Sequence, residues 1–297
     1  SEHRGDIRSI LKDNHRLDLL YALSSQRELL LEWYDFEPEA EVLQVGADYG
    51  ALTGLLRSSV SAVTVLDDTE SALETVRQRY PGAANIHYHK DSLTGYAAEA
   101  CAEGKKYDYV IFAGTLTAPY EDHIHAAKAL LKPEGILIVA SANALGMKYF
   151  AGTVEEENAL TKRQLMELLC GDKENQSMAE ENGALKFYYP MPDYKTPVSI
   201  YSDAYLPKKG DLTRVTPAYD YPPYHMMEQG EKFDTVCEAG LFDLYANSYL
   251  VFWSADPKQL QKEDERIFMK YNKTRREEFQ IKTCICERNA AGAETGN

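Results

Sequence analysis

The clearest candidate for ligand chemistry in this sequence is the glycine turn Gly46-Ala-Asp-Tyr-Gly50. Glycines let a backbone turn sharply and approach a ligand that a Cβ atom would exclude. A helix that starts directly after such a turn presents free N–H groups to the ligand. Asp67 follows Gly46 by about 20 residues, a spacing at which a carboxylate can accept hydrogen bonds from the ribose of a bound adenosine. Asp68 is then the candidate cap of the next helix, although either aspartate could act only as a cap.

The residues of this turn favour one adenosine ligand over another. A dinucleotide-binding turn has the pattern G-x-G-x-x-G, but Asp48 occupies the second glycine position and Gly50 comes one residue early. A carboxylate beside a pyrophosphate is electrostatically unfavourable, whereas a carboxylate near the ammonium or sulfonium of S-adenosylmethionine is acceptable. We therefore expect S-adenosylmethionine as cofactor, with S-adenosylhomocysteine as product, in preference to NAD.

Two further turns extend this predicted cofactor site. Asp91 and Ser92 end a third predicted strand, where they could contact adenine or could equally cap the following helix. Gly114 and Thr115 follow the fourth predicted strand and would lie under the methionine moiety, unless they form a simple tight turn. The predicted cofactor-binding set is Gln44, Gly46, Ala47, Asp48, Gly50, Asp67, Asp68, Asp91, Ser92, Gly114 and Thr115.

Candidates for the acceptor side come later in the chain. Asn143, Lys148 and Tyr149 follow the fifth predicted strand, and Tyr194 lies in a segment rich in tyrosine and proline. Tyrosine rings with hydroxyl tips suit sugars and similar polar ligands, although most of them could equally pack in the core. The sequence names no catalytic residue. Its histidines and cysteines lack metal-ligand spacing, so we expect no metal. The tyrosines concerned are Tyr188, Tyr189, Tyr194, Tyr201, Tyr205, Tyr219, Tyr221 and Tyr224.

Alternating strands and helices must position these residues. Such alternation predicts an α/β fold with a doubly wound, mostly parallel, seven-stranded sheet, whose ligands lie beyond the carboxyl ends of the strands. Helices are also predicted at 7–35, with a break at Ser24-Ser25, at 155–169 and at 257–272, and a further strand at 278–286. The seven core strands are predicted at 42–45, 62–66, 85–89, 107–112, 136–140, 184–189 and 248–253.

These elements divide the chain into five expected segments. An N-terminal helical segment and the cofactor-binding core are followed by an insertion on the acceptor side, which precedes the last core strand. A helix, a strand and a tail then complete the chain. The expected boundaries are 1–37, 38–190, 191–245, 246–256 and 257–297.

The composition disfavours several classes of protein. The net charge of −15 is unsuited to nucleic acid, because phosphate contacts require a basic surface. No apolar run is long enough to span a bilayer, and no signal peptide is evident. Five scattered cysteines suit a reducing compartment. We therefore expect a cytoplasmic protein without a nucleic-acid partner.

Several stretches resemble class I S-adenosylmethionine-dependent methyltransferases. Residues 42–56 resemble their motif I, and residues 63–67 resemble their second motif; residues 107–112 and 130–138 resemble the fourth strand and the entry to the fifth. Over nearly the whole chain the sequence is similar to bacterial methyltransferase domains found alone or joined to glycosyltransferases in surface-polysaccharide settings. The stretches that carry this similarity are 23–36, 145–152, 187–197, 201–207 and 270–283.

The resemblance implies a Rossmann-like methyltransferase fold, a small-molecule or glycan acceptor, and a glycosyltransferase as partner or fused domain. The chain departs from the family at Gln44, where an acid is usual, at Asp48, which replaces a glycine, and at Ala142, which replaces a glutamate. An acidic-His-Thr-Gly stretch is present only as residues 155–158. Two alternatives therefore stay open: a methyltransferase-like interaction domain with weak or no turnover, and an NAD-dependent oxidoreductase.

Overall fold

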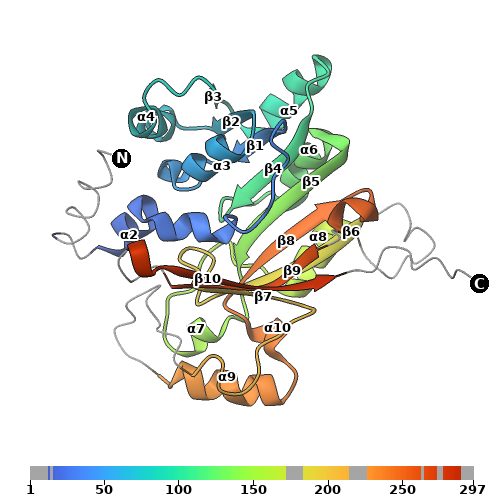
Figure 1. The fold of residues 1–297 in the computed structure, drawn as a ribbon. Coiled ribbons are helices and arrows are strands. Elements are labelled where there is room, and N and C mark those ends of the chain that lie inside the picture. The colour runs from blue at the N-terminus through green and yellow to red at the C-terminus, as the bar shows by residue number, and fades with distance from the viewer. Residues whose placement is uncertain are drawn as a thin grey trace, which may run out of the picture.

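The computed structural model describes residue 13 and residues 16–171, 183–213, 226–261, 264–272 and 277–288. Within these residues the chain forms a ten-stranded sheet in the order β10-β9-β7-β6-β8-β5-β4-β1-β2-β3 (Figure 1). No helix in this described part is long and apolar enough to cross a membrane. Tyr219, Tyr221 and Tyr224 of the predicted acceptor segment lie outside the described residues.

The first half of the chain builds the parallel part of the sheet. β1 pairs with β2 on one side and with β4 on the other, while β3 and β5 extend the sheet outward. The central strands are apolar runs because helices cover both faces, and in β4 Val110, Ile111 and Phe112 are all buried. The bounds are β1 Glu41–Val45, β2 Ala62–Asp67, β3 Ile86–Lys90, β4 Tyr107–Ala113 and β5 Leu131–Ala142.

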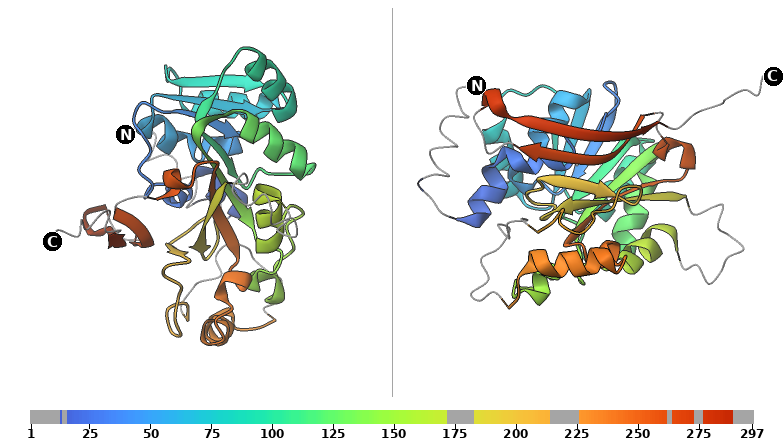
Figure 2. Two further views of the ribbon diagram at one scale, coloured as in Figure 1. Left: turned by 90° about the vertical axis from the view of Figure 1, so that its right-hand side faces the viewer. Right: turned by 60° about the horizontal axis from the view of Figure 1, so that its bottom comes forward.

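The second half of the chain adds antiparallel strands. β8 lies between β5 and β6 and is antiparallel to both, and the β9–β10 hairpin extends the sheet beyond β7 as a long curved ribbon (Figure 2). The expected seven-stranded, mostly parallel sheet is therefore wrong in extent: the described strands number ten, with five antiparallel and four parallel pairings. The bounds are β6 Ala184–Met191, β7 Ser199–Ser202, β8 Ser248–Ser254, β9 Asp264–Asn272 and β10 Ile281–Arg288.

Helices pack on both faces of the sheet and form two apolar cores. Residues 29–36 cover one face together with α3 and α4, and α5, α6, α8, α9 and α10 contribute to the core on the other. The helix bounds are α2 Leu17–Leu23, α3 Thr53–Ser59, α4 Glu70–Arg79, α5 Leu93–Ala102, α6 Tyr120–Ala129, α7 Met147–Phe150, α8 Lys162–Cys170, α9 Gln229–Glu238 and α10 Phe242–Tyr245; the 3-10 helices are η1 Ser25–Leu30, η2 Asp48–Gly50, η4 Pro257–Leu260 and η5 Glu277–Phe279.

Three predicted helices differ from the structure. The long N-terminal helix breaks at Ser24, as expected, because its hydroxyl accepts a hydrogen bond from Gln26 N and starts η1 instead; the part before residue 16 lies almost wholly outside the described residues. The helix predicted at 155–169 starts only at Lys162, where Thr161 and Gln164 form a capping box. The helix predicted at 257–272 is wrong, since most of that segment is β9, paired with β7 and β10.

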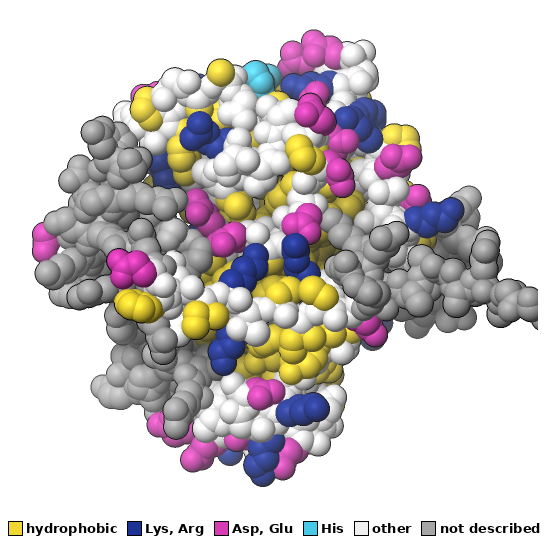
Figure 3. Space-filling model, in the orientation of Figure 1, with side chains coloured by type: hydrophobic (Ala, Val, Ile, Leu, Met, Phe, Trp, Pro, Cys, Tyr) yellow, Lys and Arg dark blue, Asp and Glu magenta, His cyan; other side chains and the backbone are white. Residues whose placement is uncertain are grey.

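On the face seen in Figure 3, the basic side chains of the described residues are interspersed with acidic ones. The face also shows apolar side chains between the charged groups. The switch in strand order that matters for ligands lies between β1 and β4, where the connections that leave the carboxyl ends of the two strands run in opposite directions.

Candidate functional site

The glycine turn after β1 has an unusual backbone. Gly46 and Gly50 have φ angles of 86° and 72°, and Asp48 and Tyr49 also have positive φ angles, 41° and 52°. Glycine adopts this region freely, whereas the two other residues are strained, by about 1 to 3 kcal/mol each. A side chain at Gly46 would collide with Thr115, whose Cβ lies 2.7 Å from the position of such a Cβ atom. Surrounding contacts must hold this turn in place.

Gln44 supplies two of those contacts. Its buried amide nitrogen donates to the carbonyl oxygens of Gly46, at 3.1 Å, and Ala47, at 3.4 Å, while its amide oxygen accepts from the Thr53 hydroxyl at 2.8 Å. The side chain therefore points into the protein and orders the turn. An amide can do this because it carries both donors and an acceptor, whereas a carboxylate could not donate to the carbonyls.

Asp67 joins the turn after β1 to the end of β2. One carboxylate oxygen accepts from Ala47 N at 2.9 Å, and the other accepts from the backbone N–H of Thr69 at 2.9 Å and from the Thr69 hydroxyl. Thr69 is the N-cap position of α4. The cap role expected of Asp68 is therefore wrong: Asp67 bonds the backbone N–H of the N-cap residue, and Asp68 is exposed.

Asp91 and Ser92 end β3 with a local turn. The Ser92 hydroxyl caps α5 by accepting from Gly95 N at 3.1 Å, and Asp91 accepts from Ser92 N at 2.7 Å. Ligand atoms of Asp91, His89 and Glu99 lie within 4.8 Å of one another. The spacing of these three residues in the sequence does not indicate that they lie close together. Exposed acidic groups commonly lie close together without binding a metal.

Gly114 and Thr115 close the end of β4. The Thr115 hydroxyl donates to Val45 O, so it bridges β4 to β1. The ring of Tyr194 fills the space above Gly114, because a Cβ atom there would lie 2.5 Å from Tyr194 Oη. The structure thus brings together Gly114 from the predicted cofactor set and Tyr194 from the predicted acceptor set.

Arg27 was missed by the sequence analysis. Its guanidinium is 4% exposed and donates to Asp48 Oδ2 from Nε at 3.2 Å and from Nη2 at 3.1 Å. Nη2 also donates to Ala113 O at 2.5 Å, and Nη1 donates to Tyr194 O at 2.8 Å. The guanidinium carbon lies 4.9 Å from the centre of the Tyr194 ring, a cation–π distance. No spacing in the sequence indicates that Arg27 meets these residues, although it lies in the stretch 23–36 that carries the family resemblance.

Lys148 lies in a buried ionic network with Asp193 and Glu156. Its Nζ atom is 2.8 Å from Asp193 Oδ2 and 2.6 Å from Glu156 Oε1, and Lys195 Nζ lies 3.1 Å from the same Glu156 oxygen. Burial alone would lower the pKa of Lys148, but Asp193 and Glu156 raise it well above its usual value. Burial likewise disfavours the charged Glu156, yet the two lysines keep the pKa of that carboxyl below its usual value.

Asn143 and Tyr149 have other surroundings. The amide nitrogen of buried Asn143 donates to Leu244 O and Ala246 O, both at 2.7 Å, and its oxygen accepts from Leu145 N at 3.0 Å. Those bonds use both donors of the amide, so Asn143 ties the end of β5 to the segment before β8. The Tyr149 hydroxyl accepts from Glu156 N at 3.4 Å, and burial raises the pKa of Tyr149 to about 12.

A cavity of about 230 Å³ opens at the carboxyl ends of β4 and β5, and we call it the strand-end cavity. Tyr194 and Gly114 line it, whereas Asn143, Lys148 and Tyr149 do not. Glu156 was not among the predicted site residues, although its acidic stretch was noted. The lining residues are Gly114, Leu116, Ala140, Ser141, Ala142, Glu156, Glu157, Asn158 and Tyr194.

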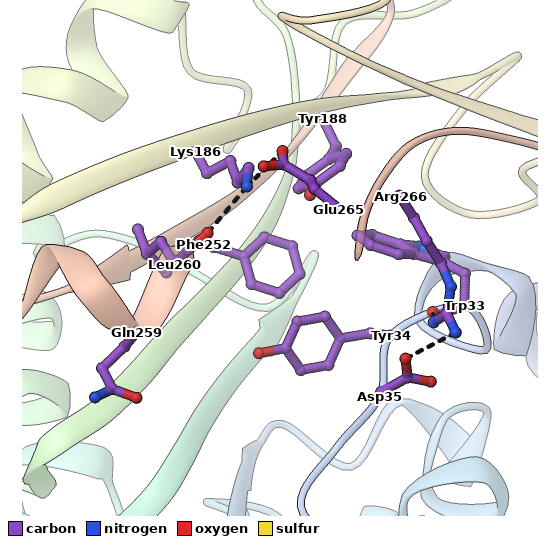
Figure 4. A pocket seen from close by; sticks show the side chains of 10 residues that line it. All are labelled: Trp33, Tyr34, Asp35, Lys186, Tyr188, Phe252, Gln259, Leu260, Glu265 and Arg266. Atoms are coloured by element: carbon purple, nitrogen blue, oxygen red, sulfur yellow. Dashed lines mark hydrogen bonds and ion pairs between the residues drawn. The ribbon is translucent and has the colours of Figure 1, made fainter. Parts of the chain in front are cut away.

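A second cavity, of about 30 Å³, lies away from the strand ends (Figure 4). Phe252, which lines it, pairs with Ile138 in the middle of β5. Two ion pairs border it, Lys186–Glu265 at 2.5 Å and Arg266–Asp35 at 2.7 Å. Its size and its mutually paired charges do not suit the predicted cofactor. The lining residues are Trp33, Tyr34, Asp35, Lys186, Tyr188, Phe252, Gln259, Leu260, Glu265 and Arg266.

Comparison with known proteins gives matches among solved structures. No protein-family model matches the chain, and no curated protein matches it. A methyltransferase of Thermotoga maritima, described as a possible histamine N-methyltransferase, is 13% identical with a TM-score of 0.44, over 81% of this chain and 91% of that one. The phosphoethanolamine N-methyltransferase 1 of Haemonchus contortus, solved with S-adenosylhomocysteine, is 15% identical with a TM-score of 0.44, over 65% of this chain and 45% of that one.

The N-methyltransferase NodS of Bradyrhizobium japonicum, also solved with S-adenosylhomocysteine, is 20% identical with a TM-score of 0.34, over 40% of this chain and 60% of that one. The chain is thus structurally similar to S-adenosylmethionine-dependent methyltransferases at low identity. The similarity concerns the fold alone. It gives no support to an association with a glycosyltransferase.

Proposed function

We propose that this chain is an S-adenosylmethionine-dependent methyltransferase that acts on a small-molecule or glycan acceptor. The observation that carries the proposal is the 2.9 Å hydrogen bond between Ala47 N and the Asp67 carboxylate. This bond joins the glycine turn after β1 to the end of β2, beside the switch in strand order between β1 and β4. Ligands of open α/β sheets bind outside the carboxyl ends of the strands at such a point.

The groups at this point suit the adenosine half of the cofactor. A carboxylate offers about four lone-pair sites, and the three hydrogen bonds that Asp67 accepts leave capacity for a ribose hydroxyl. When bound, S-adenosylmethionine supplies a methyl group already activated by its sulfonium. The tasks left to the chain are positioning and exclusion of water, and the strand-end cavity beside Gly114 offers room for an acceptor.

The NAD-dependent alternative is disfavoured by the sheet. A dinucleotide-binding sheet has the strand order 3-2-1-4-5-6, whereas antiparallel β8 takes the place beside β5 here. The electrostatic argument against a pyrophosphate is weaker than the sequence suggested, because Arg27 compensates the charge of Asp48. The strand order therefore supports the methyltransferase reading more strongly than Asp48 does.

A second candidate function is a cofactor-binding interaction domain with little turnover. One observation favours it: the Tyr194 ring covers Gly114, at the place where the methionine moiety was expected. Binding of the cofactor without methylation of any of a set of amine and sugar acceptors would favour this candidate over the enzyme.

Calorimetry with S-adenosylhomocysteine tests the proposal. Asp67→Asn keeps an oxygen for Ala47 N but removes the charge, and we expect it to weaken binding at least about tenfold, about 1.4 kcal/mol. Glu103→Gln, at an exposed position directly after α5 and outside the predicted cofactor-binding set, is the control and should bind as the wild type does. Equal binding by both variants, or binding of NADH in place of S-adenosylhomocysteine, would overturn the assignment.

A further inference from the structure

We propose that the strand-end cavity is the acceptor subsite and selects a compact acceptor that carries an amine, with Glu156 as the specificity-determining residue. This inference rests on the proposed methyltransferase function. It names the class of acceptor, which neither the fold nor the cofactor residues define.

The location of the cavity supports its use by an acceptor. Its walls come from the ends of β4 and β5, so it adjoins Gly114 and therefore the predicted cofactor site. Tyr194 forms one wall and is fixed there by several contacts: its N–H donates to Ser248 Oγ at 2.9 Å, and its carbonyl accepts from Arg27. A wall held in this way is pre-organised, which lowers the entropic cost of ordering it around a ligand.

Glu156 lies in this wall with its orientation fixed by neighbouring side chains. Lys148 and Lys195 both bond Oε1, while Oε2 accepts from the Tyr194 hydroxyl at 3.3 Å. Since each carboxylate oxygen has two lone pairs, Oε2 can accept a further hydrogen bond from a ligand. The two lysines also keep the pKa of Glu156 low, so this group is a hydrogen-bond acceptor and a poor base at neutral pH.

The charges around the cavity favour an amine over an anion. Lys148 and Lys195 balance Asp193 and Glu156, and exposed Glu157 then leaves the wall with a net negative charge. Among the described residues that line the cavity, none is lysine, arginine or histidine. A phosphate or carboxylate would be repelled, whereas an ammonium group would be attracted.

The same lining distinguishes an amine from a hydroxyl. Methylation of a hydroxyl gains most from a base whose pKa lies near the working pH. The described lining offers a tyrosine hydroxyl, whose pKa burial raises well above its usual value, and a carboxylate with a lowered pKa. Neither has a pKa near neutrality. An amine needs no such base: an ammonium group loses one proton to bulk water before the attack, and the neutral amine then attacks the methyl group through its own lone pair. The proton of the resulting methylammonium group passes to solvent after the transfer.

Glucose and two sugars that each differ from it at one group provide the test: glucosamine, with an amine at C2, and glucuronate, with a carboxylate at C6. Binding is measured by saturation-transfer NMR and calorimetry at pH 7, with and without saturating S-adenosylhomocysteine. We expect glucosamine to bind at least about fivefold more tightly than either of the others. Glu156→Gln should remove this preference, with thermal unfolding measured to check that the variant folds.

Glu157→Lys keeps the test valid if Glu156→Gln fails to fold, because Glu157 is exposed at the rim. This variant should bind glucosamine more weakly and glucuronate more tightly than the wild type does. Glu155→Lys is the matched control, since Glu155 is exposed on the same loop but does not line the cavity, and it should leave the preference unchanged.

Equal binding of the three sugars, tighter glucuronate or no sugar binding would overturn the inference. If the wild-type protein prefers glucosamine but does not bind S-adenosylhomocysteine, the proposed function is overturned and the cavity remains a binding site for amines.

Discussion

The guanidinium of Arg27 contacts a single oxygen of the Asp48 carboxylate through two of its nitrogens, Nε at 3.2 Å and Nη2 at 3.1 Å. Asp48 has a positive φ angle, and Arg27 is almost fully buried. The charge of Asp48, which the sequence predicted to lie near the cofactor, is therefore compensated within the protein. Arg27 also donates to carbonyl oxygens at the end of β4 and at Tyr194, so it connects the glycine turn with a wall of the strand-end cavity.

Removing this side chain should destabilise the fold. We expect Arg27→Ala to lower the free energy of unfolding by about 3 kcal/mol, because it leaves a partly buried carboxylate and two carbonyl oxygens without their donor. Urea denaturation measures the change. Arg163→Ala, at a side chain that is 83% exposed, is the control and should stay within about 0.5 kcal/mol of the wild type. A loss below about 1 kcal/mol in Arg27→Ala would contradict this account.

Gly114 should tolerate no side chain because of Tyr194. Gly114→Ala places a Cβ atom 2.5 Å from the Tyr194 hydroxyl oxygen at a φ angle of 78°. Gly104→Ala has a similar φ angle, 74°, but meets nothing within 4 Å, so it isolates the cost of the backbone conformation, about 1 kcal/mol. We expect Gly114→Ala to cost at least about 2 kcal/mol more, from overpacking. Thermal unfolding of the two variants measures the difference. Equal losses of stability would show that the Tyr194 ring moves aside without an energetic cost.

Acid should remove the stability that Glu156 contributes. The pKa of Glu156 is lowered in the folded protein, so its contribution is present above the unfolded value of 4.5 and is lost as the pH falls through the folded value. Denaturation at a series of pH values should show the wild type losing stability below about pH 4.5 more steeply than Glu156→Gln. Parallel curves of stability against pH for the wild type and Glu156→Gln would contradict a stabilising role of the Glu156 carboxylate. Glu155→Gln is the control and should follow the wild type.

Loss of Lys148 should have a pH dependence of the same direction, because it breaks the same ionic network. In Lys148→Met the carboxylates of Asp193 and Glu156 keep their burial but lose their shared cation, and we expect a cost of about 3 to 5 kcal/mol at pH 7. The cost should shrink towards pH 4, because protonation of one carboxyl relieves the repulsion. Urea denaturation at both pH values measures this change, with exposed Lys209→Met as control. A cost that grows on acidification would contradict the arrangement.

The parallel part of the fold was predictable from the sequence. Apolar runs broken by glycine or aspartate located β1 to β4 within one or two residues, and β6 and β8 were located equally well. The central strands among them are buried on both faces, so their composition reflects their position in the sheet, whereas β3 lies at the edge and is partly exposed. The turns at their carboxyl ends then located Gly46, Asp67 and Gly114 at one edge of the sheet.

The antiparallel extension was predictable only in part: the strand predicted at 278–286 corresponds to β10, whereas β7 and β9 were not predicted. β9 contains Ile267, Phe268 and Met269 in succession, all buried, so the alternation of a half-exposed strand is hidden and the charged flanks suggested a helix. β7 has only four residues. The network around Glu156 could not be found either, because Lys148 lies in α7 and Asp193 follows β6, and only the tertiary fold brings them together.

The hydrogen bond from Arg27 to Tyr194 joins residues 167 positions apart in the chain. Loop closure over such a separation comes late when a chain folds, since local contacts form first. During synthesis the glycine turn, Asp67 and the first five strands would all emerge before Tyr194 is available. The edge of the sheet proposed to bind the ligand is therefore completed only after most of the polypeptide has been made, and affinity for S-adenosylhomocysteine would then report whether this part of the chain has reached its native state.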